Sequence, residues 1–97
     1  MKRRVDFLPA ARADLVRLAD FLAGASPDAA IEALEAILAG AESLSTLAER
    51  GAPAMGPNAR KLFVPFGRSA YVLMYQVRVE QALITRIFHG LEDRPLA

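Results

Sequence analysis

The hydrophobic pattern of this 97-residue chain changes its period once, and this change restricts the possible folds more than any other feature. Before residue 51, apolar side chains recur three and four residues apart, which is typical of amphipathic helices. After residue 58 they alternate or form short runs, which is typical of strands. The segment between, residues 52–58, contains two prolines and a glycine and predicts a loop. A chain of this length has room for one core, so we predict a single domain over residues 1–97.

The first half predicts a short strand followed by two helices. Residues 5–8 are mostly apolar and are stopped by a proline, which suits a short edge strand. Residues 10–23 have helical spacing and end at a glycine. Ser26-Pro27-Asp28 is a helix-start signal, and the second helix is expected to run to Arg50. The connection between the helices is short, so we expect an antiparallel helical hairpin.

The second half predicts three strands, at residues 60–65, 70–77 and 82–89. Turns are expected at 66–69 and 78–81, and a charged tail at 91–97. The order is β-α-α-β-β-β. We therefore predict an α+β fold in which the helical hairpin packs on one face of a mainly antiparallel sheet.

Composition excludes several classes of functional site. The chain has no cysteine, so disulfide scaffolds, zinc ribbons and thiol nucleophiles are excluded. Its one histidine, His89, argues against a conventional metal site, and we expect neither a metal nor a cofactor. No apolar signal core and no run of about 18 apolar residues occurs, so we expect a cytoplasmic protein with no membrane partner.

Charge is distributed unevenly along the chain. Residues 1–49 carry five basic and eight acidic side chains, whereas residues 50–97 carry seven basic and three acidic ones. Nearly all the cations are arginines, which pair with carboxylates or phosphates through two parallel hydrogen bonds. Two interpretations stay open: a solvated surface, or a basic face that binds phosphate or an acidic partner.

Four local patterns occur in a fixed order along the chain. An Asp-Leu pair ends residues 8–15, after a short strand and a helix start, and Phe21 follows near the end of that helix. Residues 60–75 begin with an Arg-Lys-Leu-Phe segment and end in a strand with two tyrosines, and residues 84–93 contain an arginine, the histidine and an acidic pair. In these patterns, over nearly its full length, the sequence resembles the RelE/ParE superfamily of bacterial toxin–antitoxin toxins.

The sequence departs from the superfamily pattern at two positions. Leu8 stands where a serine or similar residue usually caps the first helix, so the backbone N–H groups of the first turn need other hydrogen-bond acceptors. Glu92 stands where many relatives carry arginine, which removes one cation near the end of the final strand.

The resemblance implies one of two activities. RelE-like members cleave messenger RNA on the ribosome, and here that would use Lys61, Arg68, Arg86 and His89. Arginine is a poor proton shuttle, and no tyrosine follows Tyr75, so this set is incomplete. ParE-like members inhibit DNA gyrase by binding, and their final strand is the more similar. We therefore expect a gyrase-binding toxin with no catalytic residues, and the ribonuclease as the alternative.

The resemblance also implies a ParD-like antitoxin as partner in a hetero-oligomer. Its acidic, amphipathic segment is expected to contact a set of basic, aromatic and apolar residues, which could equally contact the target. These residues are Arg60, Lys61, Arg68, Tyr75, Arg86 and His89 from the strands and Leu15, Leu18 and Leu22 from the first helix.

Several of these residues have a structural interpretation that stays open beside the functional one. His89 can be a hydrogen-bonded structural histidine, and Tyr71 and Tyr75 can be packing residues. Arg86 can be held in a salt bridge or be the central cation of the open sheet face. Asp14 can simply pair with Arg12 or Arg17 along the first helix.

Overall fold

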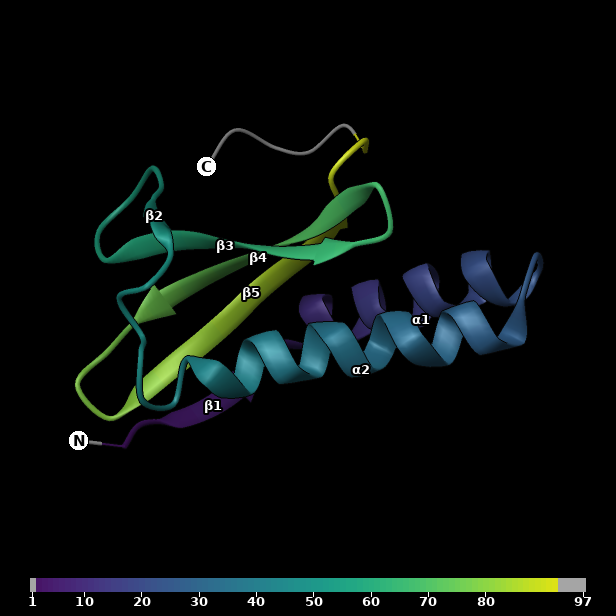
Figure 1. Cartoon of the computed structure of the whole chain (residues 1–97). Helices are drawn as coiled ribbons and strands as arrows, with labels where there is room; N and C mark the ends of the chain where they lie inside the picture. The colour runs from purple at the N-terminus through teal and green to yellow at the C-terminus, as the bar shows by residue number, and fades with distance from the viewer. Residues whose placement is uncertain (1, 93–97) are drawn as a thin grey trace.

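The computed structural model describes residues 2–92 and shows two helices packed on one face of a five-stranded sheet (Figure 1). The elements in chain order are β1 (Arg4–Phe7), α1 (Pro9–Ala23), α2 (Pro27–Ser43), β2 (Ala52–Pro53), β3 (Ala59–Phe66), β4 (Ser69–Val77) and β5 (Gln81–His89). This confirms the predicted α+β fold, with β2 as an additional strand. Residues 93–97 of the expected tail lie outside the described part of the chain.

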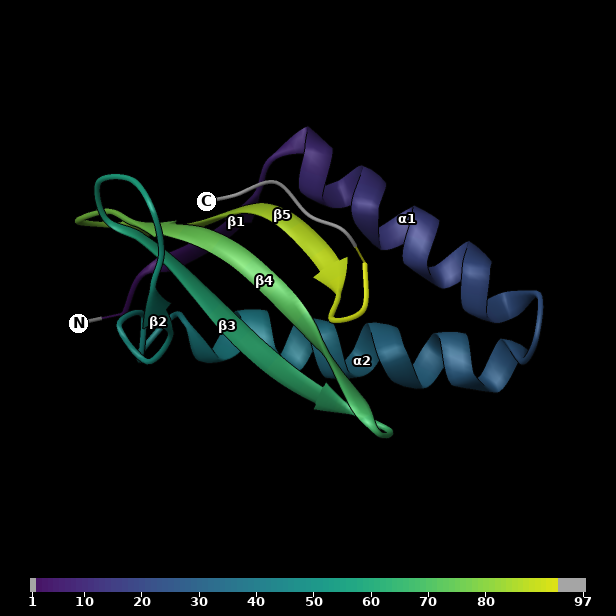
Figure 2. The same cartoon turned by 90° about the horizontal axis from the view of Figure 1, so that it is seen from above.

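The strands lie in the order β1-β5-β4-β3-β2. β1 is parallel to β5, and the other neighbouring pairs are antiparallel. The view from above shows α2 crossing beneath β3 and β4 and α1 lying on the β5 side, with both helices extending beyond one end of the sheet (Figure 2). The first and last strands are therefore neighbours, and residues 75 positions apart lie side by side.

The main core lies between the sheet and the helical hairpin. α1 contributes Ala11 and Leu18, and α2 contributes a stripe of small and branched residues centred on Ile37. Tyr71 and Tyr75 from β4 are buried in the same cluster. The opposite sheet face carries a smaller cluster, made of Val72, Met74 and Phe88 with Ala54 against it.

The second helix is shorter than the sequence predicts. α2 ends at Ser43 rather than near Arg50, and the next residues form tighter turns in which the Leu44 and Ser45 N–H groups bond three residues back. The reason is tertiary: the Ser45 carbonyl accepts a hydrogen bond from the Arg3 N–H at 2.7 Å. A continued helix would have used that carbonyl internally.

The segment predicted as a loop contains β2. Ala52 and Pro53 pair antiparallel with Lys61 and Arg60. Two residues with a proline give almost no periodic signal, and pairing with β3 alone makes them a strand.

A β-bulge in β5 sets which side chains face the helices. Tyr75 pairs with Ile84 and Met74 pairs with Arg86, so Thr85 is the extra residue, and its hydroxyl donates to the Met74 carbonyl at 3.1 Å. Ile84 and, after the bulge, Ile87 both lie in the helix-facing core. The bulge therefore turns Arg86 to the helix-free face.

Gly51 is predicted to tolerate no side chain. A Cβ there would lie 2.5 Å from the Tyr75 hydroxyl and 2.7 Å from the Lys61 carbonyl oxygen. Gly51→Ala should lower the free energy of unfolding by about 1–3 kcal/mol in urea titrations. Gly24→Ala is the matched control, because its Cβ would meet no heavy atom closer than 3.5 Å. An equal loss in both variants would contradict this packing.

Candidate functional site

The first helix lies along the part of β5 that β1 does not cover. β1 pairs with β5 only as far as Phe7 and Ile84, and beyond that point α1 follows the strand edge. Asp14 accepts a hydrogen bond from the Ile87 N–H at 2.8 Å, and Arg17 donates to the Ile87 carbonyl at 3.2 Å. Two side chains of α1 thus satisfy the backbone groups that another strand would otherwise have bonded.

The same carboxylate holds Arg86. The Arg86 guanidinium donates through Nε at 2.8 Å and Nη2 at 3.1 Å to the two oxygens of Asp14, and Arg17 donates to one of them at 3.2 Å. Asp14 is 4% exposed and is the only buried charged side chain among residues 2–92. Arg86 also lies over the Phe88 ring, 4.7 Å from its centroid. Arg86 is therefore held in a salt bridge, one of the two roles the sequence left open.

The hydrogen bonds of Asp14 keep it ionised despite its burial. Burial by itself would raise the pKa of Asp14, but the bonds from Arg86, from the Ile87 N–H and from Arg17 outweigh it and leave the pKa below its usual value. The pKa of Arg86 is raised because its charged form is bonded to Asp14. Both groups therefore carry their charge at neutral pH.

Glu92 extends this network to the end of β5. Its carboxylate accepts hydrogen bonds from Arg17 and, at 2.6 Å, from the His89 N–H. His89 Nδ1 accepts from the Leu91 N–H at 3.1 Å, and the ring meets Tyr71 edge-on at 5.5 Å. The acid that stands where many relatives carry arginine therefore ties α1 to the C-terminal turn.

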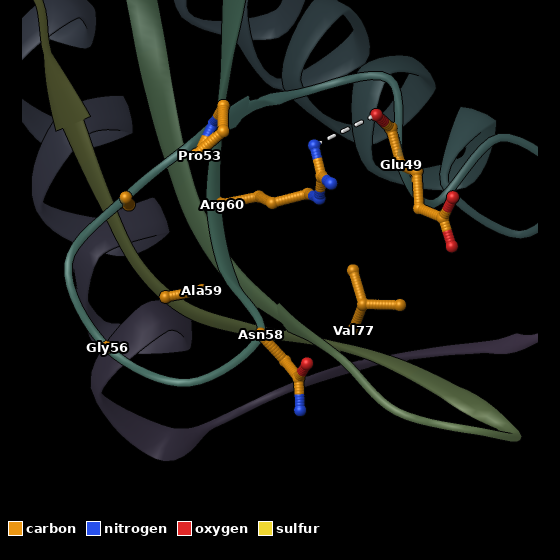
Figure 3. Close-up of a pocket in the computed structure, with 8 residues that line it drawn as sticks. Glu49, Pro53, Gly56, Asn58, Ala59, Arg60 and Val77 are labelled. Carbon is orange, nitrogen blue, oxygen red and sulfur yellow. Dashed lines mark hydrogen bonds between the residues drawn. The ribbon is translucent and has the colours of Figure 1, made fainter.

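Arg60 lies away from this network, beside a hollow of about 290 Å³ at the β2–β3 loop. It donates to the carbonyls of Glu49, at 3.2 Å, and Gly51, at 2.7 Å, and the bond to Glu49 is drawn in Figure 3. The Tyr75 hydroxyl donates to the Ala48 carbonyl at 2.7 Å and accepts from the Gly51 N–H at 3.0 Å. Arg60 and Tyr75 thus fix the turn that follows α2.

Lys61 and Arg86 share the helix-free face of the sheet. Both pair with Met74, so the three side chains form one row across β3, β4 and β5. The Lys61 Nζ lies 5.9 Å from the centroid of the Phe63 ring. A second hollow, of about 250 Å³, opens on this face and is lined by Met55, Met74, Arg86 and Phe88 among others.

The basic residues selected from the sequence do not form one common surface. Arg60 and His89 pair with Tyr75 and Tyr71, whose side chains face the helices, while Lys61 and Arg86 face the other way. Arg68 is exposed in the β3–β4 turn. The structure therefore joins Lys61 and Arg86 in one row, brings Arg60 and Arg86 to the lining of the second hollow, and places Arg68 and His89 elsewhere.

The leucines of α1 are used by the core. Leu18 is buried there, and Leu15 and Leu22 are partly buried against it. Tyr75 is buried too, with its hydroxyl bonded on both sides. These four side chains were expected to be available to a partner. In the structure the α1 stripe packs on the sheet as the predicted hairpin requires, and Tyr75 has the packing role that the sequence left open, while a contact of these residues with a partner stays a prediction.

Asp14, Arg17 and Glu92 are the site residues that sequence reasoning undervalued. Asp14 does pair with Arg17 as expected, but its stronger partners are Arg86 and Ile87, which are more than 70 positions away. The one sequence signal was the position of Asp14 beside Ala11 and Leu18 on the buried stripe.

No group of side chains in residues 2–92 has the composition of a metal site. In the same part of the chain, neither helix has the length and hydropathy needed to cross a bilayer.

Removal of the Asp14 carboxylate should strongly destabilise the fold. Asp14→Ala leaves Arg86 without its partner and the Ile87 N–H without an acceptor, and we expect a loss of about 2–3 kcal/mol in the free energy of unfolding. Asp20→Ala, on an exposed position of the same helix, should change it by less than about 0.5 kcal/mol. Urea unfolding measures both, and similar losses would refute the role assigned to Asp14.

The contribution of Asp14 should depend on pH in the acidic range. Its pKa is lower in the folded chain than the value of about 3.9 in unfolded chains, so its stabilising effect is complete above about pH 5 and is lost as the pH falls through the folded value. The difference in unfolding free energy between the native chain and Asp14→Asn should therefore shrink from pH 6 to pH 3. A difference that stays constant over this range would show that the charge of Asp14 is not involved.

Comparison with known proteins gives consistent results. Residues 5–94 match the family model described as ParE toxin of the type II toxin–antitoxin system parDE. Two curated relatives come from Caulobacter vibrioides. Toxin RelE3 is 39% identical over 92 residues, covering 95% of this chain and 99% of the relative. Toxin RelE1 is 38% identical over 84 residues, covering 87% and 89%.

Solved structures support the same fold. The chromosomal ParDE system of P. aeruginosa matches with a TM-score of 0.75 and 24% identity, over 91% of this chain and 96% of that one. The toxin–antitoxin complex RelBE2 of Mycobacterium tuberculosis matches with a TM-score of 0.65 and 22% identity, over 95% of each chain. With the family model and the curated relatives, this shows that the chain belongs to the ParE toxin family of type II toxin–antitoxin systems, within the RelE/ParE superfamily.

Proposed function

We propose that this toxin acts by binding DNA gyrase rather than by cutting RNA, and that a ParD-like antitoxin neutralises it in the cytoplasm. The observation that carries the proposal is the salt bridge between Arg86 and Asp14. Arg86 would be the main cation for a phosphate on the final strand, yet its charge is already balanced by a buried carboxylate.

A ribonuclease of this kind must stabilise a phosphorane that carries extra negative charge. Two donors of Arg86 point at Asp14, and a phosphate would have to compete with that carboxylate for them. Displacement of the guanidinium would leave the Asp14 charge buried with less compensation, which is costly. Arg86 is therefore suited to holding the fold together and poorly suited to catalysis.

The side chains that could transfer a proton are also poorly placed to do so. Tyr71 and Tyr75 are buried, and burial is the main reason that the pKa of each is raised. His89 uses Nδ1 for the Leu91 N–H. Lys61 is more than one strand away from His89 and faces the other side of the sheet. These placements favour binding without chemistry.

The antitoxin part of the proposal rests on the matches and on the helix-free face. Both matching solved structures are described as toxin–antitoxin systems or complexes. On this chain, the hollow lined by Met55 and Met74 lies beside the Lys61–Arg86 row. An antitoxin segment with an apolar side chain next to a carboxylate would complement that arrangement.

The alternative is a ribosome-dependent messenger RNA endoribonuclease. Its support is the Lys61–Arg86 row, which places two cations on one sheet face, and the RelE names of the two curated relatives.

Two assays on the purified toxin separate these functions. Supercoiling by gyrase should fall as toxin is added, and the inhibition should be relieved by the cognate antitoxin. Primer extension on translating ribosomes should show intact transcripts. Lys61→Gln should weaken inhibition or antitoxin binding, since it removes the cation of the row that no carboxylate within residues 2–92 holds, whereas Arg50→Gln, an exposed position after α2, should not. Cuts within codons that Lys61→Gln abolishes, with gyrase unaffected, would overturn the gyrase proposal.

A further inference from the structure

Four basic side chains gather at one end of the sheet. Lys2, Arg3, Arg4 and Arg78, which we call the basic tip, lie where β1 begins and where β4 turns into β5. Figures 1 and 2 both show the start of the chain and the β4–β5 turn at the same end of the molecule. Lys2, Arg3 and Arg4 are consecutive in the sequence, and only the fold brings Arg78 to them.

Two hydrogen bonds hold the tip together. The Arg3 Nε donates to the Arg78 carbonyl at 2.8 Å, and the Arg4 N–H donates to the Glu80 carbonyl at 2.9 Å. These bonds fix the chain start to the β4–β5 turn. The guanidinium of Arg78 bonds only to the uncharged Gln76 side chain, at 3.1 Å.

Acidic side chains do not balance this charge. The four cations of the tip stand against Asp6 and Glu80, which gives a net charge of +2, and Glu49 is a further acid near Val77, with which it lines a hollow. Asp6 is already engaged: hydrogen bonds from Gln81 and Arg4 lower its pKa, and the nearby charge of Arg12 adds to the effect. Lys2, Arg4 and Arg78 are exposed, and Val79 at the turn is 79% exposed, so the tip protrudes into solvent.

We propose that the basic tip binds the phosphodiester backbone of duplex DNA. Neither hollow includes any tip residue, so the tip suits a long, regular array of charges rather than a small anion. Arginine side chains match phosphate oxygens in geometry and keep their charge at every physiological pH. Such binding is independent of base sequence, because it reads only phosphates. The choice of DNA rests on the proposed function, since gyrase works on duplex DNA and a toxin bound to it lies beside that polyanion.

The basic tip differs from Arg86 in one decisive respect. Arg86 is compensated by a buried carboxylate, whereas within residues 2–92 Arg78 has no acidic partner and Arg4 has a partly exposed one. Phosphates can therefore approach the tip without displacing a buried ion pair.

Fluorescence anisotropy with a labelled 30-base-pair duplex tests the inference on the full-length toxin without gyrase. Because each neutralised phosphate contributes about −0.9 to the slope of log K against log salt, three or four contacts predict a slope of about −3. Arg4→Gln/Arg78→Gln should weaken binding about tenfold or more at low salt and reduce the slope by about 2. The matched control, Arg50→Gln/Arg68→Gln, removes the same charge from exposed positions outside the tip and should change neither value by much.

Three results would overturn the inference: no measurable binding at low salt, equal losses in the two double variants, or tenfold tighter binding to a structured RNA of equal length. Circular dichroism confirms that each variant is folded. Since gyrase is absent from this assay, failure here leaves the proposed gyrase function intact. If the toxin binds DNA but does not inhibit gyrase, the proposed gyrase function is wrong and the inference about the basic tip stands.

Discussion

The Asp14 carboxylate joins the first helix to the last strand, and the rest of the fold depends on that junction. β1 is too short to cover all of β5, so the Ile87 N–H would otherwise be a free donor at a sheet edge. An uncovered edge also invites pairing with other chains. One buried carboxylate satisfies the backbone donor and positions two arginines at once, so the edge is closed by a side chain rather than by a longer strand.

The same junction limits what the final strand can do. Two of the five N–H donors of Arg86 are held by the Asp14 carboxylate, so a phosphate would have to compete with that carboxylate for them. Glu92 adds to the effect, because it engages Arg17 and the backbone of His89 at the end of the strand. Arg86 and Glu92 both stabilise the fold in this network, and the binding function proposed above relies on surfaces outside it.

Most of the fold could be predicted because the hydrophobic period, and the residues that begin and end helices and strands, are local properties of the sequence. The caps at Ser26 and Gly24 and the alternation in β3 give element type and order directly. The end of α2 could not be predicted, since it depends on the Arg3 N–H, more than 40 residues away. The site was predicted less well. The bulge at Thr85 reverses the alternation of β5, and without it the face of Arg86 cannot be assigned from spacing.

The positions of the charged side chains show the same limit, because contacts between distant parts of the chain are not visible in the sequence. Sequence reasoning grouped the arginines of the second half because they follow one another along the chain, but pairing across the sheet distributes them over both faces. The cations of the basic tip come from two segments that are far apart in the sequence, because the parallel pairing of β1 with β5 brings the start of the chain to the turn at Arg78. The two arginines differ in their partners within residues 2–92: Arg86 is held by a buried carboxylate, whereas Arg78 bonds to the uncharged Gln76 side chain, which is why we propose Arg78 as a phosphate contact.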